Sequence, residues 1–557
     1  MAFDYAGRFI VNLLKVIGIF LVLAAAGCER EDEPEITARS QSETRPNVLI
    51  FLVDALGPEL GAYDDPAALT PAIDGLAEKG IVYTAAYAAS GSEGAAWAAL
   101  MTGVHPQTLG VVQDWTDGRG WTVAPQPEVK AFPELMRRAG YHTFLIGLGT
   151  DPFGGSSAMW DQKARGVAAT WPTADVPQPF LGVIELSTLP RNEAEAPKPK
   201  KKGLLDRLFS REEEAPAPPA IDASKIVVPA YLPDTPAIRA ALKTRYERIA
   251  ALDRQIADTL KRLEDAGALN NTIVIVTART GPPWPRAERT LYDSGVRVPL
   301  IVRHPDGRGQ GSVSNALVSG VDLAPSVLKL VGLQPMAWVQ GHDRLSASPD
   351  PAARYVFSIQ NRVGAVFERS RAVRDGRWLF IRNEAPGTRL VDLARRGEFY
   401  DLLAGKDGAA PQLAGQSIPR PAFEIYDLRN DPAQVRNLGN DPARLADAQR
   451  LNEALNEFNA ATPDLSMATT TELRDRFRPG GQTPAAAPPL VRLEGDKVVM
   501  EALTPGASIQ WREDENSAWK LYRDPVVLPE NGKLEAKSSR YGFQDSPVQP
   551  FARPKKK

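Results

Sequence analysis

Disulfide bonds within the chain are excluded, because the sequence of 557 residues has a single cysteine, Cys28. An excess of basic residues is also missing: 66 lysines and arginines stand against 68 aspartates and glutamates, which gives a net charge of −2. A protein that binds nucleic acid needs a basic excess on one face, so we expect no nucleic-acid partner. The length suits one large domain accompanied by smaller ones.

The apolar stretch near the N-terminus is too short to span a bilayer comfortably and indicates an export signal. Arg8 and Lys15 supply its positive flank, and "VIGIFLVLAAAG" ends in small residues. Cys28 follows directly, as in bacterial lipoprotein signals, where the cysteine becomes the lipidated N-terminus. We interpret residues 1–27 as such a signal and residues 28–44 as a flexible tether. The alternative is a plain signal, or an anchor helix with an incidental cysteine.

Strand and helix patterns alternate from residue 46 onward. The run "NVLIFLV" is continuously apolar and of strand length, which is typical of a parallel strand covered on both faces. A helix with one apolar face precedes the buried strand "TIVIVT"; that face consists of Ile249, Leu252, Ile256, Leu260 and Leu263. Helix followed by strand is the βαβ pattern, so we predict an α/β sheet whose functional residues gather beyond the C-terminal strand ends.

Changes in composition predict the domain boundaries. The α/β domain occupies residues 45–345 and carries a charged, proline-rich insertion at 192–219, "NEAEAPKPKKKGLLDRLFSREEEAPAPP". Strand patterns such as "YVFSIQ" and "RAVRDGRWLFIRN" indicate a smaller antiparallel unit with a closing helix at 346–465. The rest of the chain is interpreted as a linker at 466–484, an all-β module at 485–548 and a basic tail at 549–557.

Several long segments resemble the sulfatase family of the alkaline-phosphatase-like superfamily. They include "RPNVLIFLVDALGPELGAYDD", "LYDSGVRVPLIVR", "VDLAPSVLKLVG" and "EIYDLRNDPAQVRNL", and the likeness covers about residues 45–460. Their details lean towards the heparan-N-sulfatase-like branch. "PGASIQWRED" and "KLEAKSSRYG" resemble the small β-sandwich at the C-terminus of some chitobiases and hexosaminidases. The resemblance implies a large mixed, mostly parallel sheet, a smaller antiparallel sheet and a C-terminal β-sandwich.

The same resemblance implies a catalytic nucleophile that this sequence lacks. Family members oxidise the cysteine or serine of a C/S-x-P-S-R motif to formylglycine, whose hydrate attacks the sulfate. The segment "AALMTG" fixes the register and places Glu93 at the nucleophile, Ala95 at the proline and Trp97 at the arginine. Ser92 lies one residue early and lacks the proline and arginine that direct the oxidation. Glu93 cannot become an aldehyde, and its carboxylate would repel a sulfate ester.

The family's calcium ligands are also mostly replaced. In "VDALG" Asp54 is kept, but Ala55 stands where the family has a second carboxylate. In "TARTG" Arg279 replaces an aspartate, and Thr280 replaces an amide or imidazole ligand. Calcium prefers six to eight oxygen ligands, several of them carboxylate, so we expect no cofactor.

Residues that grip the sulfate in the family are replaced as well. The matching positions hold Leu148, Thr150 and Glu288, and none of the four histidines of the chain falls at a family position. Asp54 and Arg279 should lie at the ends of two strands that both faced the lost metal. We therefore predict that the Arg279 guanidinium occupies the vacated space and pairs with Asp54, and with Glu93 as a further candidate partner. The alternative is that Arg279 turns to solvent.

Three functions fit these observations. The first is a catalytically silent sulfatase relative that binds a sulfated or other acidic glycan, or another envelope protein. The second is an active sulfuric or phosphoric ester hydrolase that uses Ser90, Ser92 or Glu93, with calcium as its cofactor. The third is a structural lipoprotein that uses the fold as a scaffold. We favour the first, in a protein held to the bacterial cell envelope by lipidated Cys28, as a periplasmic or outer-membrane lipoprotein.

Overall fold

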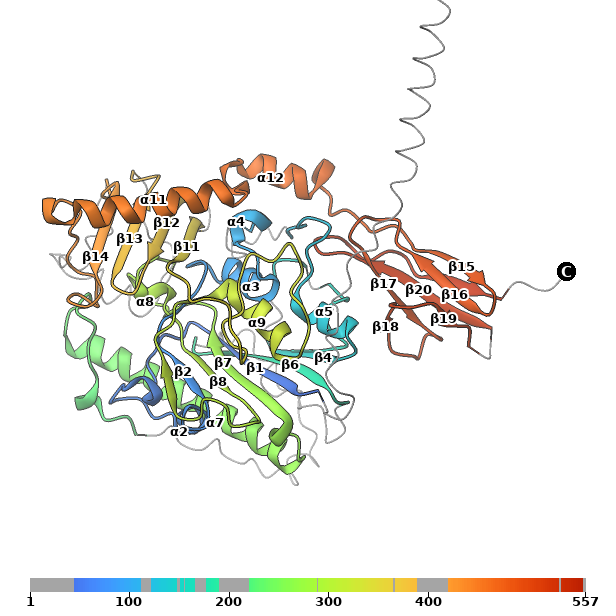
Figure 1. Ribbon diagram of the computed structural model, residues 1–557, viewed down its shortest axis with the longest axis horizontal. Coiled ribbons are helices and arrows are strands. Elements are labelled where there is room, and N and C mark those ends of the chain that lie inside the picture. Colours follow the sequence, from blue (N-terminus) through green and yellow to red (C-terminus); the bar gives the residue numbers. More distant parts are fainter. Residues whose placement is uncertain are drawn as a thin grey trace, which may run out of the picture.

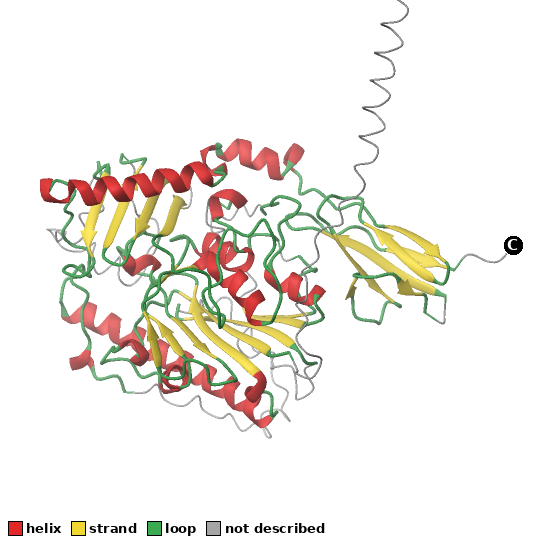
Figure 2. Cartoon of the chain, viewed as in Figure 1, coloured by secondary structure: helices red, strands yellow, loops and turns green. Residues whose placement is uncertain are grey.

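The computed structural model describes ten ranges of the chain: 45–111, 122–147, 151–154, 156–165, 177–189, 220–287, 289–363, 366–387, 419–529 and 532–553. The predicted signal, tether, Cys28 and charged insertion lie outside these ranges. Within them, no helix is long and apolar enough to cross a membrane. Figure 2 shows a large sheet between helices, a smaller sheet under a long helix, and a C-terminal unit built of strands.

A mixed, mostly parallel sheet of eight strands forms the centre of the large domain and confirms the predicted fold class. Its order is β5-β4-β6-β1-β7-β8-β2-β9. Strand β1 (Asn47–Asp54) is buried along its whole length and pairs in parallel with β6 (Phe180–Ser187) and β7 (Thr272–Ala278). The outer strands are β4 (His142–Gly147), β5 (Gln162–Arg165), β8 (Leu300–Arg303), β2 (Ile81–Tyr83) and β9 (Ser312–Ser314). Only β8 runs antiparallel to its neighbours, β7 and β2.

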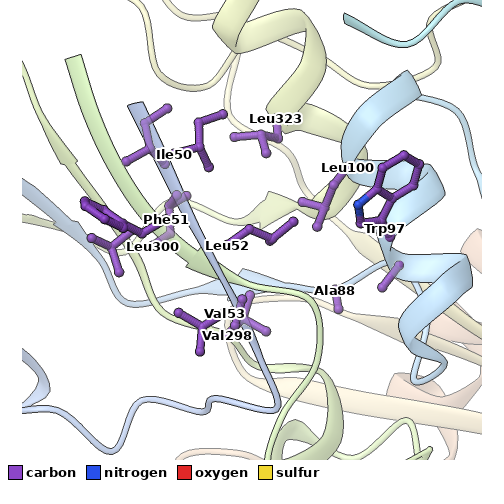
Figure 3. Packing of buried hydrophobic residues seen from close by; sticks show 14 of the residues in the cluster. Ile50, Phe51, Leu52, Val53, Ala88, Trp97, Leu100, Val298, Leu300 and Leu323 are labelled. Atoms are coloured by element: carbon purple, nitrogen blue, oxygen red, sulfur yellow. The ribbon is translucent and has the colours of Figure 1, made fainter. Parts of the chain in front are cut away.

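Helices cover both faces of this sheet (Figure 1). On one face lie α2 (Pro71–Glu78) and α7 (Pro236–Asp265); on the other lie α3 (Glu93–Thr102), α5 (Phe132–Arg138) and α9 (Leu323–Leu330). Apolar side chains of β1 meet those of α3 and α9 in one core, as Figure 3 shows. This packing leaves the C-terminal ends of β1, β6 and β7 next to the start of α3.

Helix α7 has the amphipathic face that its sequence predicts. Thr235 caps its N-terminus by accepting a hydrogen bond from the Ile238 N–H. The predicted face is buried at Ile249, Leu252, Ile256 and Leu263, with Leu260 packed against the core in part. The same helix carries Asp253, whose carboxylate accepts bonds from the N–H groups of Ala72 (3.0 Å) and Ile73 (2.9 Å). Because these N–H groups lack partners within α2, Asp253 fixes α2 to α7.

The smaller sheet is antiparallel and lies under a long helix, as predicted. Its strands follow chain order: β11 (Val356–Val363), β12 (Val366–Arg374), β13 (Trp378–Asn383) and β14 (Phe423–Asp427). Helix α11 (Leu445–Ala461) covers the sheet and buries Leu451 and Leu455 against Trp378 and Phe380.

Two segments near the C-terminus differ from the prediction. The segment 466–484, interpreted as a linker, contains helix α12 (Thr470–Phe477), which starts with a capping box formed by Thr469 and Glu472. The Thr-x-x-Glu spacing was masked by the prolines and glycines that follow it. Residues 549–552, interpreted as tail, form β21 (Gln549–Ala552), which pairs with β20 (Lys533–Ser539).

The C-terminal module consists of two small sheets around a shared core. One contains β15 (Leu490–Glu494), β16 (Lys497–Glu501) and β19 (Val526–Val527). The other contains β18, β17, β20 and β21, where β17 is Ser508–Arg512 and β18 is Lys520–Leu521. Val498, Ile509, Leu534 and Ala536 belong to the core between them.

A buried polar cluster joins this module to α5. The Glu134 carboxylate, 1% exposed, accepts hydrogen bonds from the Tyr541 hydroxyl (2.7 Å) and from the Ser508 hydroxyl. The Tyr541 oxygen also accepts from the Ala131 N–H at 3.0 Å, and the Tyr541 ring stacks on Phe153 at 5.2 Å. These contacts join the module to the large domain.

We expect Tyr541→Phe to lower the free energy of unfolding by about 1–3 kcal/mol, because it leaves a buried carboxylate oxygen and a buried N–H without a partner. Urea denaturation followed by circular dichroism measures the change. Tyr522→Phe is the control: among the described residues the Tyr522 hydroxyl accepts from the Met500 N–H, which lies inside the module, and Tyr522 is half-buried. Equal losses of unfolding free energy in the two variants would contradict a stabilising role for the contacts between α5 and the C-terminal module.

Candidate active site

The residues at the predicted site come together at the C-terminal edge of the large sheet. Asp54 ends β1, Glu185 lies opposite Leu52 on β6, and Arg279 directly follows β7. Parallel strands end at the same edge, so the three side chains meet although up to 225 residues separate them in the sequence.

The Arg279 guanidinium lies between two carboxylates. Its Nε is 3.2 Å from Asp54 Oδ1, and its Nη2 donates to Glu185 Oε1 in a very short contact. The indole N–H of Trp97 donates to the same Glu185 oxygen at 3.2 Å. Arg279 is only 2% exposed. The predicted Asp54–Arg279 pair is thus confirmed, and a solvent-facing Arg279 is excluded.

Glu185 is a member of this site that the sequence analysis missed. It is 2% exposed and is the only charged residue in the strand "FLGVIELS". A single acidic residue within a buried apolar strand needs a cationic partner, and this was the available signal. Glu93, the further candidate partner of Arg279, also interacts with it electrostatically.

Burial dominates the protonation of Asp54. It raises the pKa of this carboxyl from 3.8 to about 7, although Arg279 acts in the opposite direction; Glu93 and Glu185 raise it further. Burial also opposes the charge of Arg279, but Asp54, Glu185 and Glu93 outweigh it and raise the Arg279 pKa above its usual value. One guanidinium is therefore surrounded by three carboxyl groups.

The position of the family nucleophile lies at the start of α3. Glu93 is the first helical residue and is partly exposed; Ser92 is its N-cap and is 3% exposed. The Ser92 hydroxyl accepts a hydrogen bond from the Gln360 side chain at 2.8 Å, and the Ser92 N–H donates to Ser90 Oγ at 3.2 Å. Gln360 comes from β11, and nothing in the sequence indicated this contact.

Trp97, at the position of the motif arginine, is fully buried. Its ring meets Phe153 edge-on at 6.0 Å, and its N–H is bonded to Glu185. An indole with 0% exposure cannot serve as a stacking platform for a sugar. Trp97 fills this part of the site with apolar packing.

The loop after β1 is held by Arg245. Its Nη2 donates to the Ala55 carbonyl at 2.9 Å, and its guanidinium pairs with Glu59 at 2.7 Å. The Thr188 hydroxyl donates to the same carbonyl at 2.9 Å and accepts a bond from Arg245 Nη1 at 3.1 Å. Ala55 itself has φ 56°, a left-handed conformation that is unfavourable for alanine.

We expect Ala55→Gly to raise the free energy of unfolding by up to about 1 kcal/mol, because glycine adopts this conformation without the steric cost that alanine bears. Thermal unfolding measures the change. Ala98→Gly, in the middle of α3, is the control and should lower the stability by about 1 kcal/mol. A loss of similar size in both variants would show that Ala55 is not strained.

The donor set does not fit a calcium ion. Asp54 and Glu185 both face the Arg279 guanidinium, and Ala55 offers no side-chain oxygen. Thr280 is buried, and its carbonyl accepts from the Leu56 N–H at 3.0 Å. Among the described residues, no group of three or more His, Cys, Asp or Glu could hold a metal. The replaced grip positions Leu148, Thr150 and Glu288 lie outside the described ranges.

Comparison with known proteins agrees with this geometry. The sheet, the flanking helices and the strand-end site define an alkaline-phosphatase-like fold of the sulfatase type. A model of the family described as Sulfatase matches residues 46–333, and the chain belongs to this family.

Individual relatives extend the likeness. An ulvan-active sulfatase from Formosa agariphila is 26% identical over 97% of both chains. Human N-sulphoglucosamine sulphohydrolase is 26% identical and covers 75% of this chain and 90% of its own. Among solved structures, a putative sulfatase from Bacteroides thetaiotaomicron has a TM-score of 0.54 at 19% identity and covers 75% of this chain and 93% of its own. That last similarity concerns the fold alone.

Proposed function

We propose that this sulfatase-family protein has lost sulfuric ester hydrolysis and acts by binding. The observation that carries the proposal is the position of Arg279, whose guanidinium pairs with Asp54 and Glu185 at the strand ends. A fixed cation there removes the need for calcium and takes up the carboxylates that would bind it. We expect no resident metal.

The nucleophile position supports the same proposal. Glu93 cannot be oxidised to an aldehyde, and Ser92 is buried and hydrogen-bonded by Gln360. Three carboxyl groups around one guanidinium also give this site an excess of negative charge above pH 7, which repels a sulfate ester. Loss of the nucleophile alone costs about a millionfold in kcat in a serine protease.

The class of ligand is inferred from a relative that this chain matches over almost its whole length. The ulvan-active relative matches along 97% of the chain, including the C-terminal module. We infer a sulfated or otherwise acidic glycan as the ligand, since that relative is an ulvan-active sulfatase.

The test is an assay of the full-length protein against aryl sulfate and aryl phosphate esters, with and without calcium, together with a measurement of bound metal. We expect no turnover above background and no stoichiometric metal. Ser92→Ala and Glu93→Gln provide matched variants, which should behave like the wild type. Turnover that either variant abolishes would overturn the proposal in favour of an active hydrolase with altered residues.

We also propose that the protein is anchored to the bacterial envelope through lipidated Cys28. Cys28→Ser is expected to move the protein from the membrane fraction to the soluble fraction and to remove the mass of the acyl chains, because a lipid anchor supplies the membrane affinity. Fractionation and mass spectrometry measure these changes. Retention of the variant in the membrane would favour an uncleaved anchor helix instead.

A further inference from the structure

We propose that the protein binds one anionic sugar residue in a cavity where the large domain, α12 and the C-terminal module meet. The cavity has a volume of about 260 Å³ and is partly open to solvent. Its walls come from α4 (Pro106–Leu109), the segment 124–127, the segment 465–484 and residues 540–543. It shares no residue with the Asp54–Arg279 site.

The walls of the cavity present apolar faces of ring size. Phe477 and Phe543 contribute phenyl rings, and four prolines contribute further apolar surface. The C–H faces of a pyranose ring pack well on such surfaces. Sites for small molecules typically combine a mainly apolar lining with a few polar groups that fix orientation.

The charged groups of the lining are all positive. Arg476 and Arg540 line the cavity, and no carboxylate does so among the described residues. Arg540 lies over the Phe543 ring at 4.4 Å and donates to the Pro125 carbonyl at 3.3 Å, which fixes its orientation. Guanidinium groups bind carboxylate and sulfate oxygens through paired N–H donors. The cavity therefore suits an anionic ligand.

Gln126 joins two of the walls. Its amide nitrogen donates to the Thr108 carbonyl at 2.8 Å and so connects the segment 124–127 to α4. A ligand that presents an apolar ring face to these walls and a negative group to the two arginines is an acidic sugar, which is the ligand class of the proposed function.

The size of the cavity limits the ligand to a single sugar residue. Sites for drug-sized molecules occupy about 300–1,000 Å³, and 260 Å³ lies below that range. The end of a glycan chain fits, with the remaining residues outside. This inference rests on the proposed binding role, but it does not depend on the loss of catalysis.

Isothermal titration of the full-length protein tests the proposal with three tetrasaccharides. One comes from polygalacturonate and carries only carboxylates, one from carrageenan and carries only sulfates, and maltotetraose is neutral. We expect binding of at least one anionic tetrasaccharide and none of maltotetraose; the anionic arm that binds identifies the negative group. Equal binding of maltotetraose, or no binding of any of the three, would overturn the proposal.

Paired arginine variants locate the site. Arg476→Gln is expected to weaken binding by about tenfold or more, since it removes a charge-assisted contact. Arg474→Gln is the matched control: Arg474 is exposed on the same helix, pairs with Asp475, and does not line the cavity. An equal effect of the two variants would indicate general attraction to a polyanion and overturn the site. A negative result in these binding experiments would not change the outcome of the ester hydrolysis assays, so the sugar-binding cavity and the loss of catalysis are tested separately.

Discussion

Arg279→Leu is expected to lower the free energy of unfolding by about 3–5 kcal/mol, the loss typical of a buried ion pair that keeps only one partner. The substitution leaves Asp54 and Glu185, both at most 3% exposed, without their cation. Urea denaturation followed by circular dichroism measures the loss. It should be the largest single-residue effect at this site.

Two further variants distinguish the loss of the Arg279 charge from the loss of its packing contacts. Adding Asp54→Asn and Glu185→Gln to Arg279→Leu should recover most of the lost stability, because no buried charge then remains unpaired. Arg239→Leu is the surface control: Arg239 of α7 pairs with the exposed Asp234, which precedes the helix, and ion pairs in water contribute far less than buried ones. If Arg279→Leu cost no more than Arg239→Leu, the guanidinium would not be the internal counter-ion.

The stability of the protein should depend on pH through Asp54. The folded pKa of about 7 lies above the usual 3.8, so the folded state holds a proton that the unfolded state loses first. The contribution of Asp54 to the free energy of unfolding is therefore fully present below about pH 4 and is lost as the pH rises through 7. Between pH 4 and pH 8 we expect the free energy of unfolding of the wild type to fall by a few kcal/mol relative to that of Asp54→Asn, since one pKa unit corresponds to about 1.4 kcal/mol.

Glu134→Gln provides a control of opposite sign. Burial opposes the ionisation of Glu134, but Lys130 and Arg138, with the Ser508 and Tyr541 hydroxyls, lower its pKa overall. Its stabilising effect is therefore present at neutral pH and is lost as the pH falls through the folded pKa. As the pH rises, the difference in the free energy of unfolding between wild type and variant should fall for Asp54→Asn and rise for Glu134→Gln. A change in the same direction for both would contradict the assignment of the pH dependence to Asp54.

The sequence predicted those features that depend on local pattern. The apolar run of β1 and the spaced apolar face of α7 indicated the buried sheet and its covering helix. The Asp54–Arg279 pair followed from the resemblance to the family, whose metal-binding loops place both positions at the same edge of the sheet.

Features that depend on distant contacts were not predictable in this way. Gln360 reaches Ser92 across 268 residues, and only the docking of the smaller sheet brings them together. Strand β21 forms because β20 offers an open edge, although its own sequence, "QPFA", has little strand character. Helix α12 depended on a capping box that its proline-rich surroundings obscured.

A counter-ion that belongs to the polypeptide differs from one taken from solution in a practical respect. Arg279 is synthesised with the chain, cannot be chelated, and has a fixed stoichiometry of one. We therefore expect the strand ends to keep the same arrangement in calcium-rich and calcium-poor surroundings, and we expect EDTA to leave the thermal unfolding transition unchanged.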